Sequence, residues 1–394
     1  MDFQILAKSY KDTSLSDVLR AFSMDMSLTY PQQKVINNLI NCKSSSLGSH
    51  SYYCHDCSYL HVSYNSCRDR HCNKCQALNQ SRWIEKKMED LLPVKYFHLV
   101  FTLPEELNPL ILRNKGVLYN LLFKAVNETL SDATRSTKNL GADIGYIATL
   151  HTWGQMLNFH PHIHCIVPSG GLSLDGKSWI KGKDSFFLSV KVLKTLLKYK
   201  YLDYLKKYYK KQKISMEGID GLQSDLDFER LINLLYSKSW HVYAKPTFKG
   251  PKQTIQYLGN YVQKVAISNS RILSIEKNKV SFKYFSYKKN KTKYTKMDGE
   301  LFVKRFLMHI LPKRFVKTRS YGYFANSNRQ TKLKTVKKLL GVAEKKKEKL
   351  TLKEELLEFF NMDLSFCPKC KSRNYHLIQD VLERSPPFIL NQAI

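Results

Sequence analysis

Three histidines stand at every second position in the segment NFHPHIHCIV, residues 158–167. Alternate side chains of a β-strand point to the same face, so His160, His162 and His164 are expected on one side and Ile163 on the other. A single histidine on a strand would more often be an ordinary packed residue. Three neutral imidazoles on one face are instead typical of a divalent metal site with open positions for phosphate oxygens.

The preceding strand candidate, residues 145–155, brings further ligand types close to this row. Gln155 and His151 can supply another ligand, or the hydrogen bonds that fix which imidazole nitrogen faces the metal. His98, in the strand candidate 95–104, is a further candidate. The catalytic divalent site is therefore predicted from His162 and His164, with His160 and Gln155 beside them.

Two tyrosines four residues apart, Tyr257 and Tyr261, offer nucleophiles for such a site. The segment 254–266 has a helical pattern, and residues four apart lie on one face of a helix. In a chain with 24 tyrosines this spacing alone is weak evidence. A phenol with a pKa near 10 needs a metal that stabilises charge on the attacked phosphate, which makes the combination informative. Attack would leave a phosphotyrosine ester that conserves the broken bond for rejoining, and two phenols allow two such links.

Five of the nine cysteines lie between residues 54 and 75. Paired Cys-x-x-Cys turns at this separation are typical of a tetrahedral structural zinc site, whose four protein ligands leave no position open for chemistry. Two other residues, between the pairs, can replace a ligand, and the spacing does not decide between the sets. The predicted ligands are Cys54, Cys57, Cys72 and Cys75, with Cys67 and His71 as alternates.

A later pair, Cys367 and Cys370, has no second pair near it in the sequence, and its role is left open.

The charge balance indicates a polyanionic partner. The chain has 64 Lys and Arg against 33 Asp and Glu, a net charge of +31. Lysine-rich surfaces also serve solubility, but so large an excess, interleaved with tyrosines that can stack on bases, favours nucleic acid. The residues expected to contact DNA are Arg68, Arg70, Lys74, Arg82 and Lys264.

Length and composition predict a globular protein of several domains. The 394 residues are 43% hydrophobic, and no stretch reaches the roughly 18 apolar residues that span a bilayer. The first residues lack the layout of a secretion signal, so we expect a cytoplasmic protein without membrane contact. The expected regions are a helical lead-in (1–50), a zinc-binding DNA-contact domain (51–92), a catalytic domain (93–312) with a helical insertion at about 186–240, and a basic, helical C-terminal region (313–394).

Three blocks of sequence resemble one family: HTWGQMLNFHPHIHCIVPSGGLSLDG, WHVYAKPTFKGPKQTIQYLGNYVQKVAISNSRI and YNSCRDRHCNKCQ. They are similar to the two-tyrosine HUH transposases of rolling-circle insertion sequences, the insertion-sequence-ninety-one type, over residues 30 to 330. HUH denotes histidine, bulky hydrophobic, histidine, here His162, Ile163 and His164. The resemblance implies an α+β fold: a central antiparallel sheet with flanking helices, the histidines on a middle strand and the tyrosines on a helix beside it.

The resemblance also implies Mg²⁺ or Mn²⁺ at the HUH pair, a structural Zn²⁺ in the N-terminal domain, and Tyr257 and Tyr261 as nucleophiles. The expected function is nicking and rejoining of single-stranded DNA at insertion-sequence ends and target DNA by rolling-circle transposition. Two alternatives stay open: a rolling-circle replication initiator with the same chemistry, and a non-catalytic zinc-dependent DNA-binding protein. The oligomeric state and the DNA sequences recognised are not predicted.

Overall fold

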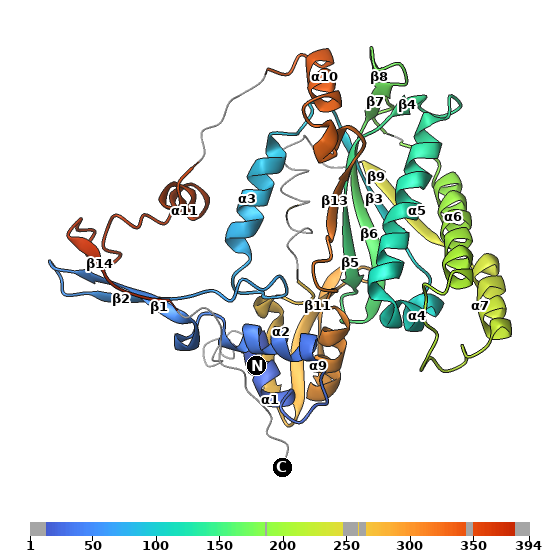
Figure 1. Cartoon of the computed structure of the whole chain (residues 1–394). Helices are drawn as coiled ribbons and strands as arrows, with labels where there is room; N and C mark the ends of the chain where they lie inside the picture. Colours follow the sequence, from blue (N-terminus) through green and yellow to red (C-terminus); the bar gives the residue numbers. More distant parts are fainter. Residues whose placement is uncertain (1–12, 186, 247–258, 260–264, 344–349, 383–394) are drawn as a thin grey trace.

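A five-stranded antiparallel sheet forms the centre of the molecule (Figure 1). The structure is a computed structural model that describes residues 13–185, 187–246, 259, 265–343 and 350–382. The histidine-rich segment is the middle strand, as expected. In spatial order the strands are β13 (Thr318–Tyr321), β5 (Tyr146–Trp153), β6 (Phe159–Pro168), β3 (Tyr96–Thr102) and β9 (His241–Pro246).

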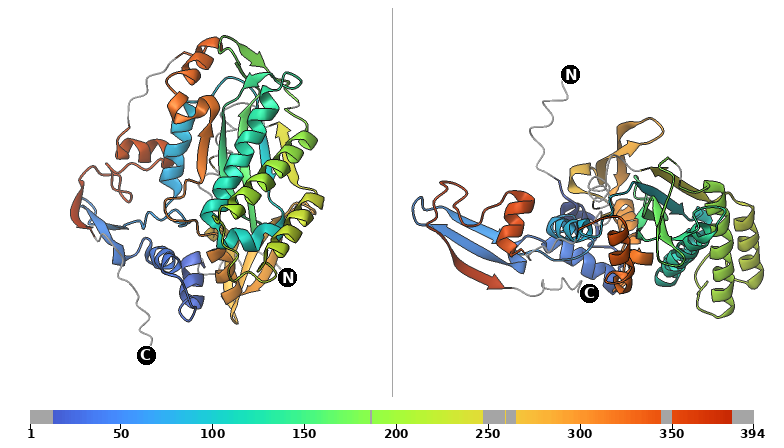
Figure 2. Two further views of the ribbon diagram at one scale, coloured as in Figure 1. Left: turned by 45° about the vertical axis from the view of Figure 1, so that its right-hand side comes forward. Right: turned by 90° about the horizontal axis from the view of Figure 1, so that it is seen from above.

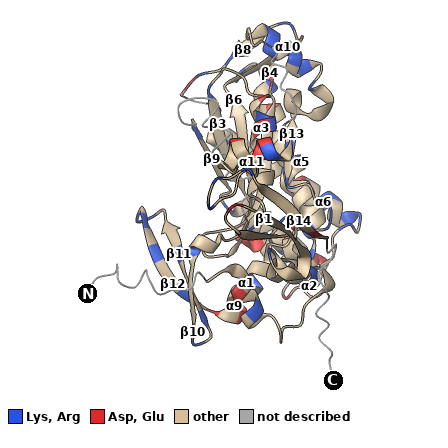
Figure 3. Ribbon diagram, turned by 90° about the vertical axis from the view of Figure 1, so that its left-hand side faces the viewer, with Lys and Arg blue, Asp and Glu red and all other residues tan. Residues whose placement is uncertain are grey.

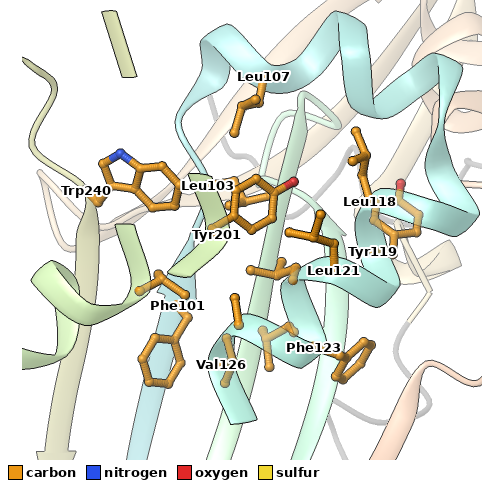
Figure 4. Packing of buried hydrophobic residues seen from close by; sticks show 14 of the residues in the cluster. Phe101, Leu103, Leu107, Leu118, Tyr119, Leu121, Phe123, Val126, Tyr201 and Trp240 are labelled. Atoms are coloured by element: carbon orange, nitrogen blue, oxygen red, sulfur yellow. The ribbon is translucent and has the colours of Figure 1, made fainter. Parts of the chain in front are cut away.

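One face of this sheet carries the main hydrophobic core. Phe97, Leu99 and Phe101 alternate along β3 and are buried there, as are Ile163 and Cys165 of β6. Helices α5 (Lys115–Arg135) and α6 (Val190–Lys210) cover this face, and α7 (Asp225–Ser237) and the short α4 (Asn108–Arg113) add side chains to the same core. Figure 4 shows side chains of α5 and Tyr201 of α6 in the cluster that contains Phe101.

The opposite face carries the histidines and packs against a second set of elements. Ile147 and Ile166 point to this side and form a cluster with Tyr96, Tyr323 and Phe324. Side chains of α3 (Ala77–Met88) and residues of α10 (Lys332–Leu339) pack on the same cluster. The histidine-bearing face is therefore lined by segments from both ends of the chain.

A second sheet with its own core lies below the first in Figure 1. A capping box formed by Thr29 and Gln32 starts the helix Tyr30–Asn41 of this unit. The second sheet and its core consist of strands β10 (Ile272–Glu276), β11 (Lys279–Ser286) and β12 (Lys291–Asp298), and helices α1 (Leu15–Phe22), α2 (Tyr30–Asn41) and α9 (Gly299–Met308).

A third sheet projects to one side of the molecule, as both views of Figure 2 show. Its order is β14 (Tyr375–Leu382), β1 (Gly48–Cys54) and β2 (Leu60–Tyr64), so the C-terminal part of the chain pairs with the N-terminal part. Helix α11 (Leu352–Phe360) lies between this sheet and α3, where Glu355 bonds Arg82. A small fourth sheet comprises β4 (Ala142–Asp143), β7 (Gly170–Ser173) and β8 (Trp179–Lys181).

The α+β class with a central antiparallel sheet and flanking helices is confirmed. Two strands of the expected C-terminal region (313–394) belong to sheets formed by earlier segments, since β13 completes the central sheet and β14 completes the projecting one. Among the described residues, no helix combines the length and the apolar character that crossing a bilayer requires.

Candidate functional site

Three buried histidines converge on the face of the central sheet opposite the main core. His162 and His164 point the same way from β6, and His151 lies directly opposite His162 on β5. One ring nitrogen from each of the three lies within 4.8 Å of the other two. Adjacent antiparallel strands hold these rings at fixed spacing, so the group is preformed by the sheet itself.

Hydrogen bonds orient two of these imidazoles. His162 Nδ1 lies 2.6 Å from the His160 carbonyl oxygen, which accepts its proton and leaves Nε2 with a free lone pair. His164 Nδ1 lies 2.8 Å from Nε2 of His98, whose ring is stacked on that of His164 at 5.0 Å. With the proton on His164 Nδ1, it is His164 Nε2 that carries the lone pair a metal would bind. Such outer hydrogen bonds are typical of metal-binding histidines.

Burial also favours the form of the rings that binds metal. Desolvation lowers the pKa of His162 to about 4 and the pKa of His98 to about 4, because a charged imidazolium loses its hydration in the sheet. Desolvation lowers the pKa of His160 too. At neutral pH these imidazoles are uncharged and can act as ligands.

The structure changes the membership of the predicted histidine site. His151 completes the group of three, whereas His160 lies outside it and contributes through its backbone carbonyl. The side-chain oxygen of Gln155 accepts a hydrogen bond from the Phe285 N–H at 3.4 Å, so coordination by Gln155 stays a prediction. The alternation of Thr149, His151 and Trp153 along β5 was the available signal for His151, but only the strand register sets it opposite His162.

The two predicted nucleophiles, Tyr257 and Tyr261, lie outside the described residues, as does Lys264. Gly259, which stands between the tyrosines, is described and is buried against α3. A Cβ added at Gly259 would lie 2.3 Å from Cδ1 of Ile84, closer than real carbons approach. Ile84 packs on the cluster that covers the histidine-bearing face, so Gly259 lies on that side of the central sheet.

A first group of cysteines gathers where the N-terminal helices meet the second sheet. Its members are close enough to share one ion, and Cys67 Sγ and Cys75 Sγ are 3.8 Å apart. The backbone N–H of Asp69 points to Cys67 Sγ at 3.5 Å and that of Lys74 to Cys72 Sγ at 3.4 Å. Such donors stabilise thiolates. The group comprises Cys42, Cys67, Cys72 and Cys75.

This grouping corrects the predicted zinc set. The structure separates Cys54 and Cys57 from Cys72 and Cys75, and places the first two beside Cys367 and Cys370. Cys42 belongs to the first group although no other cysteine is near it in the sequence. Helix α2 ends at Asn41, so Cys42 lies directly after it, beside the cysteines of the loop that follows β2.

The alternate ligand His71 is occupied elsewhere. Its Nδ1 lies 2.9 Å from Oδ1 of Asp69, and its Nε2 accepts the Leu311 N–H at 3.1 Å. Of the two alternates, the structure therefore includes Cys67 in a thiolate group and leaves His71 outside.

The predicted DNA-contact residues differ in their surroundings. Arg82 is bound in a bidentate ion pair by Glu355, with Nη2 and Oε2 2.6 Å apart, and Arg70 donates to the Phe315 carbonyl. Arg68 is exposed and Lys74 is partly exposed. Figure 3 shows further Lys and Arg residues on α6, α10 and β12, so basic side chains occur on several faces of the molecule.

Comparisons with known proteins agree with this arrangement. Residues 145–332 match the family model described as "Putative transposase", and residues 14–103 match that of the "Transposase zinc-binding domain". The chain is 39% identical over 336 residues to "Putative transposase y4qJ" of Sinorhizobium fredii, covering 84% of each protein. It is 28% identical over 300 residues to the "Transposase for insertion sequence element IS801" of Pseudomonas savastanoi pv. phaseolicola, covering 74% of this chain and 70% of that protein.

These matches define the class of protein as a DNA transposase with a zinc-binding domain. The cysteine groups of the N-terminal region and the histidine-bearing sheet agree with that class. The chain belongs to the insertion-sequence-ninety-one type of transposase. It acts in DNA transposition.

Among solved structures, the conjugative relaxase TrwC in complex with oriT DNA is a distant match at 10% identity, covering 63% of this chain and 94% of that one. A second, metal-bound TrwC complex matches at 10% identity over 60% of this chain and 96% of that one. Their TM-scores of 0.23 and 0.22 are too low to support conclusions about this protein.

Proposed function

We propose that this transposase nicks and rejoins single-stranded DNA at the ends of its insertion sequence through a phosphotyrosine link, by a rolling-circle route. The observation that carries the proposal is the group of three buried imidazoles on one face of the central sheet, with ring nitrogens within 4.8 Å of one another. Three protein ligands leave coordination positions for a substrate, as catalytic metal sites require.

The donor set fits a divalent cation. His151, His162 and His164 would hold it; burial keeps His162 uncharged, and the Nδ1 atoms of His162 and His164 are already hydrogen-bonded. Imidazole accepts several divalent metals, and the resemblance to two-tyrosine HUH transposases favours Mg²⁺ or Mn²⁺. When bound, such an ion polarises the scissile phosphate and stabilises the charge that develops on its oxygens.

The chain's own residues supply the covalent chemistry. The phenolic oxygen of Tyr257 or Tyr261 attacks the phosphorus, the bond to the 3′ oxygen breaks, and the proton of the phenol is balanced by the one gained by the 3′-hydroxyl. The 5′-phosphate stays on the tyrosine, and attack by another 3′-hydroxyl reverses the step and joins the strands. Lys and Arg hold the phosphates, and aromatic side chains stack on unpaired bases.

The position of Gly259 supports the pairing of these tyrosines with the histidines. It lies two residues from each tyrosine, and its contact with Ile84 belongs to the layer that covers the histidine-bearing face. A Cβ at Gly259 would overlap the Ile84 side chain, so either Ile84 or Gly259 would have to shift.

The proposal is tested by incubating the full chain with labelled single-stranded element ends and Mg²⁺ or Mn²⁺. A covalent protein–DNA adduct should appear on a denaturing gel, and peptide mapping should place it on Tyr257 or Tyr261. Tyr257→Phe with Tyr261→Phe should abolish the adduct and retain binding, while Tyr294→Phe, an exposed tyrosine on β12, should leave it unchanged. An adduct that survives the double substitution would disprove the assignment, and binding without any adduct from the unsubstituted chain would favour a non-catalytic DNA-binding protein.

A further inference from the structure

A second group of four cysteines joins the two ends of the chain. Cys54 and Cys57 lie at the end of β1 and in the turn after it, and Cys367 and Cys370 lie in the turn before β14. Their four sulfur atoms all lie within 4.8 Å of one another, although Cys54 and Cys370 are 316 residues apart. Neither matched family region, 14–103 or 145–332, contains Cys367 or Cys370.

The sulfur distances match those of a thiolate metal site. Cys54 Sγ lies 3.5 Å from Cys370 Sγ, and Cys57 Sγ lies 3.7 Å from Cys367 Sγ. Four sulfurs in a tetrahedron around zinc, each at about 2.3 Å, are about 3.8 Å from one another. A disulfide would require about 2.05 Å. The spacing therefore fits four ligands around one ion.

The two turns that carry these cysteines have the same backbone design. In each, the N–H of the first cysteine is bonded to the carbonyl five residues later, Cys54 to Tyr59 at 3.0 Å and Cys367 to Ser372 at 2.8 Å. In each, the residue after the second cysteine has a positive φ, 56° at Ser58 and 61° at Lys371. Such turns let two thiolates a few residues apart point to one side.

Protein contacts bring the two turns together around the sulfurs. Asp56, between Cys54 and Cys57, accepts hydrogen bonds from Ser372 and, at 2.8 Å, from the side-chain amide of Asn374. The ladder between β1 and β14 continues up to Cys54, which pairs with Tyr375. The Tyr375 ring stacks on that of Tyr52 with the centroids 5.4 Å apart. Contacts on both sides of the group thus hold the four thiols in place.

We propose that Cys54, Cys57, Cys367 and Cys370 bind a second structural zinc ion, which fastens the C-terminal segment to the N-terminal hairpin. Four cysteine ligands complete a tetrahedron, so the site has no open position and its role is structural. Binding requires deprotonated thiols, so zinc displaces protons as it binds. The zinc-binding module of this chain then has two parts, one closed locally by Cys42, Cys67, Cys72 and Cys75 and one closed across the length of the chain.

The first test counts metal in the full-length protein. After purification with zinc and removal of loosely bound ions, the unsubstituted chain should retain two zinc ions. Cys367→Ser with Cys370→Ser should retain one, and so should Cys67→Ser with Cys75→Ser. Lys369→Ala, which changes an exposed residue between Cys367 and Cys370, is the matched control and should retain two. A count that is unchanged by loss of Cys367 and Cys370, or iron in place of zinc, would overturn the proposal.

The second test needs no substitution and so does not depend on how the variants fold. Cys370 is exposed and its thiol should react readily with a maleimide if it is free. In the reduced, zinc-loaded chain its alkylation should be about tenfold slower or more than after treatment with a strong zinc chelator. Mass mapping should show that all four cysteines of the group become reactive together. Equal rates with and without the chelator would exclude a bound metal.

Discussion

The histidine group and the cysteine groups are both clusters of metal-binding side chains, but they are built in opposite ways. The histidines are three, are buried, and stand on two adjacent strands in the middle of a sheet. Eight of the nine cysteines form two sets of four, held mainly by turns and loops outside the central sheet. Four thiolates saturate a tetrahedral ion, whereas three imidazoles leave room for a phosphate. On this basis we propose a structural role for the two cysteine groups and a catalytic role for the histidine group.

Removing the first cysteine group should have the largest effect. Structural zinc sites contribute about 10 kcal/mol or more of apparent binding energy, which is folding energy where the site does not exist in the unfolded chain. Cys67→Ser with Cys75→Ser should therefore expose the amides of residues 42–76 to hydrogen exchange while the central sheet stays protected. Ser66→Ala, at an exposed neighbouring position, is the control. Unchanged protection in the cysteine variant would argue against a structural ion there.

Removing the histidine group should abolish most of the catalysis and leave the N-terminal module folded. His162→Ala with His164→Ala should lower the rate of adduct formation by about 10³-fold or more, since a bound metal contributes several kcal/mol of charge stabilisation. Zinc content and exchange protection of the N-terminal module should not change. His160→Ala changes a residue outside the group and should retain most activity. Normal nicking by the double variant would refute the metal assignment and remove the contrast between the two kinds of cluster.

Acid should weaken the contact between α9 and the central sheet, where the buried ring of His309, at the end of α9, bonds Thr152 and the Leu157 carbonyl. Burial lowers the pKa of His309, which bonds the Leu157 carbonyl, to about 4, whereas an unfolded histidine has a pKa near 6.5. Because the folded pKa is depressed, this contribution is fully present above about pH 6.5 and is lost as pH falls towards 4. It amounts to at most about 3 kcal/mol. Chemical unfolding of the chain free of divalent metal, measured from pH 7 to 4, should show this loss.

His309→Gln should reduce that pH dependence, because the substituted residue does not titrate while His98 and His162 still do. Its packing cost is the same at every pH, so the slope and not the absolute stability is compared. An identical slope in the variant and the unsubstituted chain would contradict a buried neutral His309.

The substitution with the smallest expected effect tests whether the segment that contains the two tyrosines lies against the histidine-bearing face. Gly259→Ala should cost about 1–3 kcal/mol of local packing, because the added Cβ overlaps Ile84, and adduct formation should fall. Ile84→Ala removes both atoms that the Cβ would meet, so the double variant should recover part of the activity lost by Gly259→Ala. Strictly additive losses would show that Gly259 and Ile84 do not act through this contact.

Much of the central sheet could be predicted from the sequence because its signals are local. The alternation in FHPHIHCIVP places His162 and His164 on one face of β6 whatever surrounds the strand. The sequence also indicated His151 as a candidate on the neighbouring strand. Which of His151, His160 and Gln155 joins His162 and His164 depended on the register of β5 against β6. Strand register is a tertiary property, since a shift of one residue reverses every side chain.

The sequence by itself determined the kinds of ligand, the two-residue spacing of the histidines, and the paired turns of Cys54 with Cys57 and Cys367 with Cys370. Only the tertiary structure decided which turns meet. The spacing of cysteines along the chain indicates which thiols within one turn can share an ion, but it does not indicate a partner 316 residues away. The pairing of β1 with β14 brings the turn of Cys367 and Cys370 to the turn of Cys54 and Cys57. In the same way, α2 places Cys42 beside Cys67, Cys72 and Cys75. Long-range pairing fixes the partners, and local geometry then fixes how the ligands face one another.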